Sequence, residues 1–235
     1  MNKISIIIPV LNEAETIENL LFHLIDCSAI QNIAEIIVVD GGSTDGTIPI
    51  IKNLGLSIIV LNSDKGRAKQ MNLGASEAKG SVLYFLHADS FPPNRYDQLI
   101  LSAIQNDNTA GCFKMKFDSN HWWLKLASWF TQFNWQMCRG GDQSLFVTNS
   151  LFKNIGGFDE NFTIYEDNDF IAKLYKRNQF VVLQDWLTTS SRRYVKQGIG
   201  KLQFHFLAIH LKKRLGASPE NLNSYYLKHI ASTNN

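Results

Sequence analysis

Short apolar runs alternate with helical segments over residues 1–90, and this alternation restricts the fold more than any other feature of the sequence. The runs are rich in β-branched residues, which is typical of strands buried on both faces. They are Ile4–Val10, Glu35–Val39, Ser57–Leu61 and Ser81–Leu86. Helix signals over 47–54 and 66–79 separate them. Because parallel strands need such crossovers, the sequence predicts an α/β fold with a mostly parallel central sheet flanked by helices.

The second half of the chain is less regular. Strands are predicted over 110–117 and 144–147, and a helix over 166–177. The aromatic-rich segment 121–138 and the tail from Val195 onward are predicted to be helical. No internal repeat or low-complexity linker interrupts the sequence.

Composition excludes several classes of protein. The chain has 235 residues, 45% of them hydrophobic, and a net charge of +2, which argues against disorder and against nucleic-acid binding. Its three cysteines, Cys27, Cys112 and Cys138, lack the spacing of a zinc site or a disulfide framework. A reduced, cytoplasmic compartment is therefore expected. The apolar run after Met1 favours a first strand over a signal peptide, and no membrane span is expected.

A glycine-rich loop, Asp40–Gly46, follows the second strand run. It is not a P-loop, since no Lys-Ser or Lys-Thr follows Gly46, and its glycine spacing is not that of a dinucleotide fingerprint. Carboxylates here would repel phosphate but could accept hydrogen bonds from a base edge or from ribose hydroxyls. The loop is therefore either part of a nucleotide site or an ordinary turn.

The triplet His87-Ala88-Asp89 follows the fourth strand run. An exposed carboxylate beside an imidazole can ligate a divalent ion when a nucleotide diphosphate supplies further oxygens. A polar strand end without a ligand is the alternative interpretation.

Three acids, Glu166, Asp167 and Asp169, open the helix predicted over 166–177. Helix capping explains one or two of them, and a positioned carboxylate can also act as a general base for a hydroxyl nucleophile. The later turn Arg192-Arg193-Tyr194 could hold a diphosphate through paired guanidinium hydrogen bonds, or it could simply face solvent.

Together these segments resemble a family 2 glycosyltransferase with the GT-A fold. Order and spacing agree over about residues 3–193, and five segments carry the resemblance. They are Ile7–Glu13, Val38–Thr47, Gly66–Ala75, Leu86–Asp89, and Gly156–Glu160 followed by Glu166-Asp167. The resemblance implies a GT-A domain over 1–195, with a nucleotide-binding half at about 1–90 and an acceptor half at about 91–195. A helical C-terminal extension, 196–235, would pack on it.

The resemblance also implies a role for each matching residue. Asp40 would bind the base, typically uracil, and Arg193 would lie over the diphosphate. The other nucleotide-binding residues would be Pro9, Glu13, Arg67 and Gln70. Asp167 would be the general base, supported by Glu166 or Asp169. The acceptor side would include Asp142 and Gln143.

The implied cofactor is Mn²⁺ or Mg²⁺ held by Asp89. His87 stands where the family has the first aspartate of its metal-binding DxD, so it becomes a second candidate ligand. Because imidazole shifts a ligand set toward softer ions than an all-oxygen site, the metal preference stays open.

The expected function is inverting transfer of a sugar from a nucleotide sugar, with UDP the expected nucleotide, to an acceptor hydroxyl. The acceptor could be a saccharide, a lipid-linked molecule or a small molecule, and the oligomeric state is unknown. Two alternatives remain. One is a nucleotidyltransferase that makes nucleotide sugars, although Asn12-Glu13 stands where its basic glycine-rich loop would be. The other is a non-catalytic nucleotide-sugar-binding domain.

The aromatic segment 122–135 has two interpretations. Its apolar residues recur at helical spacing, which fits core packing. The same pattern fits a surface for a lipid-linked acceptor or for the inner face of a membrane. The stretch 202–215, which ends in Lys212-Lys213-Arg214-Leu215, allows the same two interpretations. A peripheral membrane contact therefore stays open.

Overall fold

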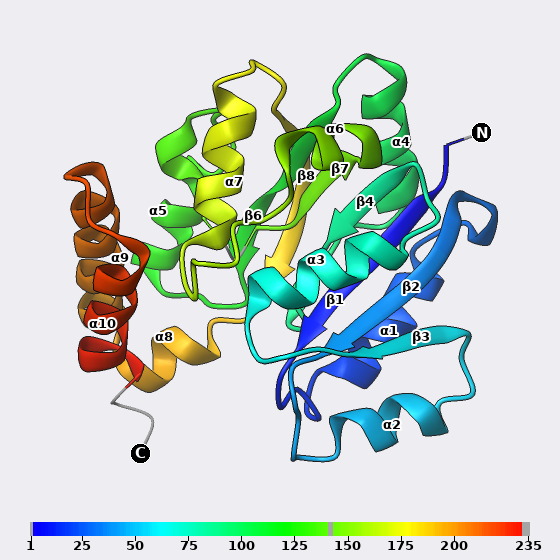
Figure 1. The fold of residues 1–235 in the computed structure, drawn as a ribbon, viewed down its shortest axis with the longest axis horizontal. Coiled ribbons are helices and arrows are strands. Elements are labelled where there is room, and N and C mark those ends of the chain that lie inside the picture. Colours follow the sequence, from blue (N-terminus) through cyan, green and yellow to red (C-terminus); the bar gives the residue numbers. More distant parts are fainter. Residues whose placement is uncertain (1, 141–142, 232–235) are drawn as a thin grey trace.

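A single eight-stranded sheet runs through the computed structural model, which describes residues 2–140 and 143–231 (Figure 1). Its strand order is β3-β2-β1-β4-β7-β6-β8-β5. The strands are β1 (Ile4–Val10), β2 (Ile33–Asp40), β3 (Ile58–Asn62), β4 (Val82–Phe85), β5 (Ser90–Phe91), β6 (Ala110–Phe117), β7 (Leu145–Thr148) and β8 (Val181–Thr189).

Helices cover both faces of this sheet and extend beyond one end of it. In the first half they are α1 (Ile17–Asp26), α2 (Thr47–Asn53), α3 (Arg67–Glu77) and α4 (Tyr96–Gln105), with a 3-10 turn, η1, at Ile30–Asn32. In the second half they are α5 (Trp122–Phe130), the 3-10 turn η2 (Gln136–Cys138), α6 (Asn149–Ile155), α7 (Glu166–Tyr175), α8 (Arg192–Gln197), α9 (Ile199–Arg214) and α10 (Pro219–His229).

The first four strands pair in parallel, as the alternation of strand and helix signals predicts. β1 lies between β2 and β4, and β2 also pairs with β3. Every residue of β1 is buried, because helices cover the sheet on both sides. Parallel pairing brings the carboxyl ends of these strands to one edge, where Val10 of β1 pairs with Asp40 of β2.

Strand β7 joins the two halves of the molecule. It pairs antiparallel with β4 on one side and with β6 on the other, while β6 and β8 are parallel. The sheet is therefore continuous and mostly parallel, and the fold class predicted from the sequence is confirmed.

Close packing of α3 on the sheet depends on Gly74. A Cβ atom at this position would lie 2.5 Å from Cγ2 of Ile7 and 3.1 Å from Cγ2 of Val39. Such distances are far inside van der Waals contact, so a larger residue would push α3 away from β1 and β2. The glycine fixes the position of the first turn of α3, which carries two candidate site residues, Arg67 and Gln70.

Several elements differ from the sequence-based expectation: β5, β8, α4 and α6 are not predicted, and the aromatic helix has other bounds. Strand β8 is not predicted, because its central residues are exposed and include Gln184 and Asp185 in place of a continuous apolar run. The aromatic helix is shorter than 121–138: α5 ends at Phe130. In α5 only Leu124 and Ser128 are buried, so the core-packing interpretation is wrong for Trp122 and Trp129, whose side chains are exposed.

The C-terminal helices α9 and α10 stand together at one end of the molecule, at the left of Figure 1. They share the main core through the buried side chains of Leu202, Ile209 and Leu222. Across the described ranges 2–140 and 143–231, no helix is both long enough and apolar enough to cross a membrane.

Candidate active site

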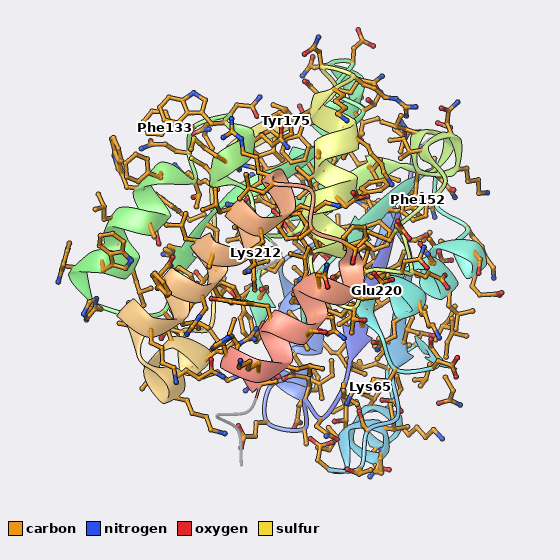
Figure 2. All side chains as sticks on the ribbon, turned by 60° about the vertical axis from the view of Figure 1, so that its left-hand side comes forward. Lys65, Phe133, Phe152, Tyr175, Lys212 and Glu220 are labelled. Atoms are coloured by element: carbon orange, nitrogen blue, oxygen red, sulfur yellow. The ribbon has the colours of Figure 1, made fainter. Side chains whose placement is uncertain are left out.

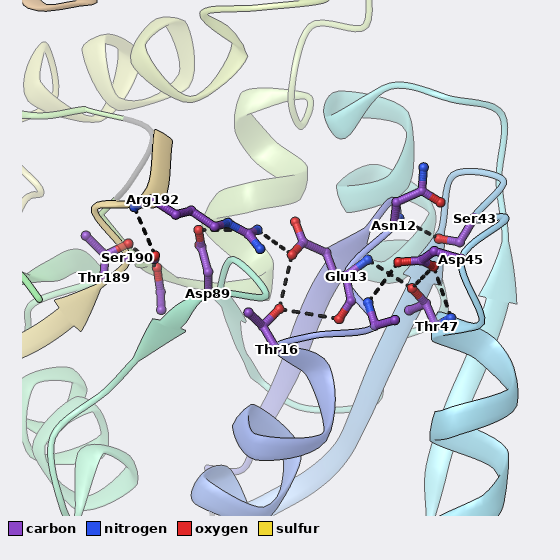
Figure 3. Close-up of polar contacts among 12 residues, drawn as sticks. Asn12, Glu13, Thr16, Ser43, Asp45, Thr47, Asp89, Thr189, Ser190 and Arg192 are labelled. Carbon is purple, nitrogen blue, oxygen red and sulfur yellow. Dashed lines mark hydrogen bonds and ion pairs between the residues drawn. The ribbon is translucent and has the colours of Figure 1, made fainter. Parts of the chain in front are cut away.

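The loops that follow β1 and β2 are tied together by hydrogen bonds (Figure 3). The backbone amide of Asn12 donates to Oγ of Ser43 (2.9 Å), and the amide of Thr44 donates to Oδ1 of Asn12 (2.8 Å). The amide of Glu13 donates to Oγ1 of Thr47 (2.9 Å). These bonds fix a polar rim at the carboxyl edge of the sheet, where ligands bind in open α/β folds.

Asp45 ties this rim to the segment before α1 and to the start of α2. Its carboxylate accepts hydrogen bonds from the amide of Ala14 (3.0 Å) and from Thr47. Desolvation opposes the effect, but these hydrogen bonds lower the pKa of Asp45, because they stabilise its ionised form. The loop between β2 and α2 is therefore built around an ionised acid.

Asp40 is buried at the end of β2. Its Oδ1 accepts hydrogen bonds from the backbone amide (3.0 Å) and the hydroxyl (2.6 Å) of Ser43. Two carboxylate oxygens offer about four lone-pair sites, so Asp40 can still accept a hydrogen bond from a ligand. Pro9 is buried beside it, within β1, where it pairs with Val39.

The side chain of Gln70 links the ends of strands β1 and β2. Its side-chain amide donates to the carbonyl oxygens of Val10 and Val39, both at 2.8 Å. The side chain is buried, and its amide nitrogen is occupied by backbone. These bonds hold together the strand ends that carry Asp40 and Glu13.

Arg192 spans the acids at the ends of β1 and β4 (Figure 3). Its Nη2 lies 2.5 Å from Oε2 of Glu13 and 3.7 Å from Oδ2 of Asp89. Desolvation opposes the effect, but the hydrogen bond to Glu13 and the charges of Glu13 and Asp89 raise the pKa of Arg192. The sequence pointed to the turn containing this arginine but assigned the diphosphate to Arg193, its neighbour.

His87 and Asp89 lie in the segment that follows β4, where a divalent ion is expected from the sequence. Among residues 2–140 and 143–231, no group of three or more His, Cys, Asp or Glu side chains could hold a metal by itself. An ion at Asp89 would therefore need oxygen ligands from a bound diphosphate, which is the arrangement that the sequence predicts. The donor set fits an ion shared with a nucleotide.

The three acids at the start of α7 differ in their burial and in their partners. Glu166 is fully buried, and its Oε1 lies 2.8 Å from Nε of Arg67 in an ion pair. Within the described part of the chain, neither oxygen of Glu166 has an aligned hydrogen-bond partner. Asp169 is paired with Lys173 one turn later, at 2.9 Å. Asp167 lines a cavity, so it is the acid of this cluster that a substrate can reach there.

This cavity has a volume of about 500 Å³ and lies between α5, α7, α9 and α10. One part of its wall is polar and contains Arg67, Asp167 and Arg193. The rest of the lining is mainly apolar and aromatic. It includes Phe130, Trp135, Met137, Phe206, Leu207 and Tyr226.

Arg193 belongs to the cavity and not to the strand-end edge. Its guanidinium donates to the hydroxyl of Tyr226 and lies over the rings of Tyr226 and Phe206, at 5.4 and 5.5 Å from their centroids. Gln143 also lines the cavity, and its side chain donates to the carbonyl of Cys138 (3.2 Å). Asp142, the other predicted acceptor-side residue, lies outside the described residues.

Sequence reasoning missed Arg139 in the cavity wall. This side chain is buried, and its Nη2 donates to the carbonyls of Thr131 (2.6 Å) and Phe133 (2.7 Å). It therefore holds the bend between α5 and η2 while placing a positive charge beside the cavity. The Gly140-Gly141 pair directly after it in the sequence was the available signal, because glycine pairs mark loops and loops often carry binding residues.

His210 and Tyr165 were missed as well. Nδ1 of His210 and the hydroxyl of Tyr165 are 3.0 Å apart in the cavity wall. Burial lowers the pKa of His210 by disfavouring its charged form. The sequence offers no signal for this pair, since 45 residues separate its members.

Comparison with known proteins identifies the family. The model of "Glycosyl transferase family 2" matches residues 5–180. An undecaprenyl-phosphate 4-deoxy-4-formamido-L-arabinose transferase from Proteus mirabilis is 29% identical over 136 residues, which are 54% of this chain and 41% of the relative. The probable glycosyltransferase YdaM of Bacillus subtilis is 25% identical over 197 residues, which are 74% of this chain and 46% of the relative. This chain thus covers less than half the length of these two relatives.

Solved structures share the fold at lower identity. A mannosyltransferase from Pyrobaculum calidifontis, in complex with GDP-Man and Mn²⁺, superposes with a TM-score of 0.70 at 18% identity, over 99% of this chain and 74% of that one. TarS from S. aureus in complex with UDP has a TM-score of 0.63 at 18% identity, over 97% of this chain and 70% of that one. The GT-A arrangement expected from the sequence is thereby confirmed. With a family model that matches most of its length, this chain belongs to glycosyl transferase family 2.

Proposed function

We propose that this chain transfers a sugar from a nucleoside diphosphate sugar to an acceptor bound in the cavity, with inversion at the anomeric carbon. The observation that carries this proposal is the position of Asp167, a nearly buried acid in the cavity wall beside the ion pair between Arg67 and Glu166. A polar edge for the donor and an apolar cavity for the acceptor would then meet at this acid.

The donor would bind across the ends of β1, β2 and β4. Asp40 would accept a hydrogen bond from the base, and Glu13 would face the ribose. UDP is the nucleotide we favour, and it is the nucleotide held by the TarS structure. Arg192 and Arg67 would contact the diphosphate, with Arg192 released from Glu13 when the nucleotide arrives. Residues 1–90 would thus form the nucleotide half and residues 91–195 the acceptor half, with the helical extension 196–235 closing the cavity.

Asp89 and His87 would hold Mn²⁺ or Mg²⁺ together with diphosphate oxygens. A bound divalent ion would neutralise the charge that builds on the departing diphosphate. Nη2 of Arg192 lies 3.7 Å from Oδ2 of Asp89, so this carboxylate already stabilises a neighbouring positive charge. The mannosyltransferase structure that shares the fold contains Mn²⁺, which supports this assignment.

Asp167 would act as the general base. An acceptor hydroxyl is a weak nucleophile near neutral pH, so a carboxylate must take its proton as it attacks the sugar. Arg67 and Glu166 hold the first turn of α7 in place, and Asp169 is occupied by Lys173. General base catalysis of this kind contributes about 100- to 10,000-fold to the rate.

The apolar wall of the cavity supports a lipid-linked acceptor. The aromatic and aliphatic side chains of the lining would cover an apolar chain or ring while its nucleophilic end reaches Asp167. The name of the Proteus mirabilis relative specifies undecaprenyl phosphate, an acceptor of this type. Saccharides and small molecules are the other acceptors to be screened.

A nucleotide-sugar assay separates this proposal from its two alternatives. The protein is incubated with UDP-sugars and Mn²⁺, with and without lipid-linked acceptors, and released UDP is measured. Release that depends on acceptor supports transfer. Formation of pyrophosphate from UTP and a sugar phosphate would identify a nucleotidyltransferase, and UDP-sugar binding without any turnover would identify a binding domain.

A further inference from the structure

Exposed apolar side chains gather around the mouth of the cavity. One group lies on α5 and the segment through η2, and another lies on α9 and the residue that follows it. We call these residues the α5–α9 face. They are Trp122, Trp123, Leu126, Trp129, Phe130, Trp135 and Met137 in the first group, and Phe204, Leu207, Leu211 and Leu215 in the second.

The second group forms a straight stripe along α9. Phe204, Leu207, Leu211 and Leu215 are spaced three or four residues apart, so they lie on one side of the helix. They are 66%, 70%, 56% and 78% exposed. Leu202 and Ile209 point to the core instead. Helix α9 therefore has two apolar sides, and only one of them is used by the fold.

Helices α5 and α9 are neighbours on the molecular surface (Figure 2). Side chains of both line the same cavity, among them Phe130 and Leu207. The two groups thus border the same cavity. Exposed apolar side chains that gather in one region of a surface mark an interaction site.

Positive charge accompanies this face. The sequence of α9 contains Lys201, Lys212, Lys213 and Arg214 and no acid, and α5 contains Lys125 and no acid. Lys212 and Lys213 lie over the rings of Tyr225 and Phe162, so Lys201, Arg214 and Lys125 are the charges available to flank the face. The whole chain has a net charge of only +2, so this is a local excess. Aromatic and aliphatic side chains flanked by lysines and arginines are the composition that binds anionic membrane interfaces. A second copy of this chain docked on this face would be repelled, because both copies carry the same positive charge there.

We infer that the α5–α9 face docks on a membrane surface with anionic headgroups, so that the cavity mouth opens toward the bilayer. This inference extends the proposed function, and it rests on that function to explain why the face would bind a membrane. Phe130, Met137 and Leu207 belong both to the face and to the cavity wall. A lipid-linked acceptor could therefore slide from the bilayer into the cavity and reach Asp167 without crossing water.

Vesicle flotation tests this inference without nucleotide or acceptor. The purified chain is mixed with vesicles of phosphatidylcholine alone or of phosphatidylcholine with phosphatidylglycerol. We expect the protein to float with the anionic vesicles, and we expect high salt to weaken binding because it screens the lysines. The double variant Leu211→Glu/Leu215→Glu should reduce the bound fraction about tenfold or more, because two charged side chains would enter the interface. Neither leucine lines the cavity.

The matched control is Phe22→Glu/Ile30→Glu. These side chains are 43% and 79% exposed but lie on α1 and η1, away from the α5–α9 face. This variant should float like the wild type. A second variant, Lys201→Glu/Arg214→Glu, should lose the preference for anionic over neutral vesicles.

Two results would overturn the inference. One is equal flotation of the wild type and Leu211→Glu/Leu215→Glu. The other is a concentration-dependent dimer, seen by light scattering, that this variant abolishes while the wild type ignores vesicles. UDP-induced thermal shifts of all variants verify folding. Because flotation needs no nucleotide, its failure leaves the proposed transfer untouched, and absent UDP binding with intact flotation would refute only the proposed transfer.

Discussion

The strand-end edge and the cavity are built in opposite ways. At the edge, Asn12 binds Ser43 and Glu13 binds Thr47, and Gln70 links the ends of β1 and β2. The cavity is lined mainly by aromatic and aliphatic side chains from distant segments, with a few charged groups at one side. A preorganised polar rim suits a ligand of fixed shape with many hydrogen-bonding groups, whereas an apolar cavity tolerates ligands that vary in length. This contrast is why we propose a nucleotide for the edge and a lipid-linked acceptor for the cavity.

The largest expected effect lies where the two regions meet. Asp167→Asn keeps the size of the side chain but cannot take a proton, so transfer to a hydroxyl acceptor should fall at least about 100-fold. Donor binding, measured by calorimetry, should stay within a few-fold of wild type. Asp169→Asn is the matched control, and it should do much less because Asp169 is paired with Lys173.

The same pair of variants can break the base assignment. If Asp169→Asn abolishes transfer while Asp167→Asn remains active, the wrong acid has been chosen. If neither variant slows transfer to a lipid phosphate acceptor, the nucleophile is a phosphate oxygen that is already ionised, and no general base is needed.

A smaller effect is expected at the polar edge. Asp40→Ala should weaken UDP binding by about 1–3 kcal/mol, which is roughly 5- to 150-fold, because a hydrogen bond to the base is lost. Ser43→Ala tests whether Asp40 acts only by ordering its loop, since the Ser43 hydroxyl binds Oδ1 of Asp40. Equal losses from both variants would indicate loop ordering. Unchanged UDP affinity in Asp40→Ala would remove this residue from the site.

Asp89 provides a test of whether a divalent metal ion takes part in donor binding. Mn²⁺ should strengthen UDP binding to the wild type by about tenfold, equivalent to 1.4 kcal/mol, and should have little effect on Asp89→Asn, which lacks a hard anionic ligand. Calorimetric titrations with Mn²⁺ and with EDTA measure this difference. Wild-type binding that ignores EDTA would show that donor binding at the edge relies on Arg192 and Arg67 alone.

The smallest effect concerns the cavity wall and pH. Because burial lowers the pKa of His210, the folded state binds fewer protons than the unfolded state as the pH falls below about 6.5. Stability should therefore decrease as the pH is lowered from about 7.5 to about 5.5. In His210→Gln this decrease should be smaller, by a few degrees of Tm at most. A pH dependence that is unchanged in His210→Gln would assign the effect to another group.

Much of the strand-end edge could be predicted without a structure. The strands β1, β2 and β4 follow from short apolar runs, and parallel pairing then forces their carboxyl ends, with Glu13, Asp40 and Asp89, to one edge. Strand β8 could not be predicted, since its apolar residues are interrupted by exposed polar ones. Helix α4 is missed although its buried Tyr96, Ile100 and Ala103 recur at helical spacing. The roles expected of the site residues remain predictions.

The sequence by itself determined the fold class and the family, because both depend on local periodicity and on motifs whose residues are close along the chain. Only the tertiary structure decided which acid of the α7 cluster reaches the cavity, and that Arg192 lies across Glu13 and Asp89 while Arg193 turns to Tyr226. It also decided that the aromatic side of α5 faces outward. Periodicity indicates that a helix has an apolar side, but what covers that side depends on contacts between segments far apart in the chain.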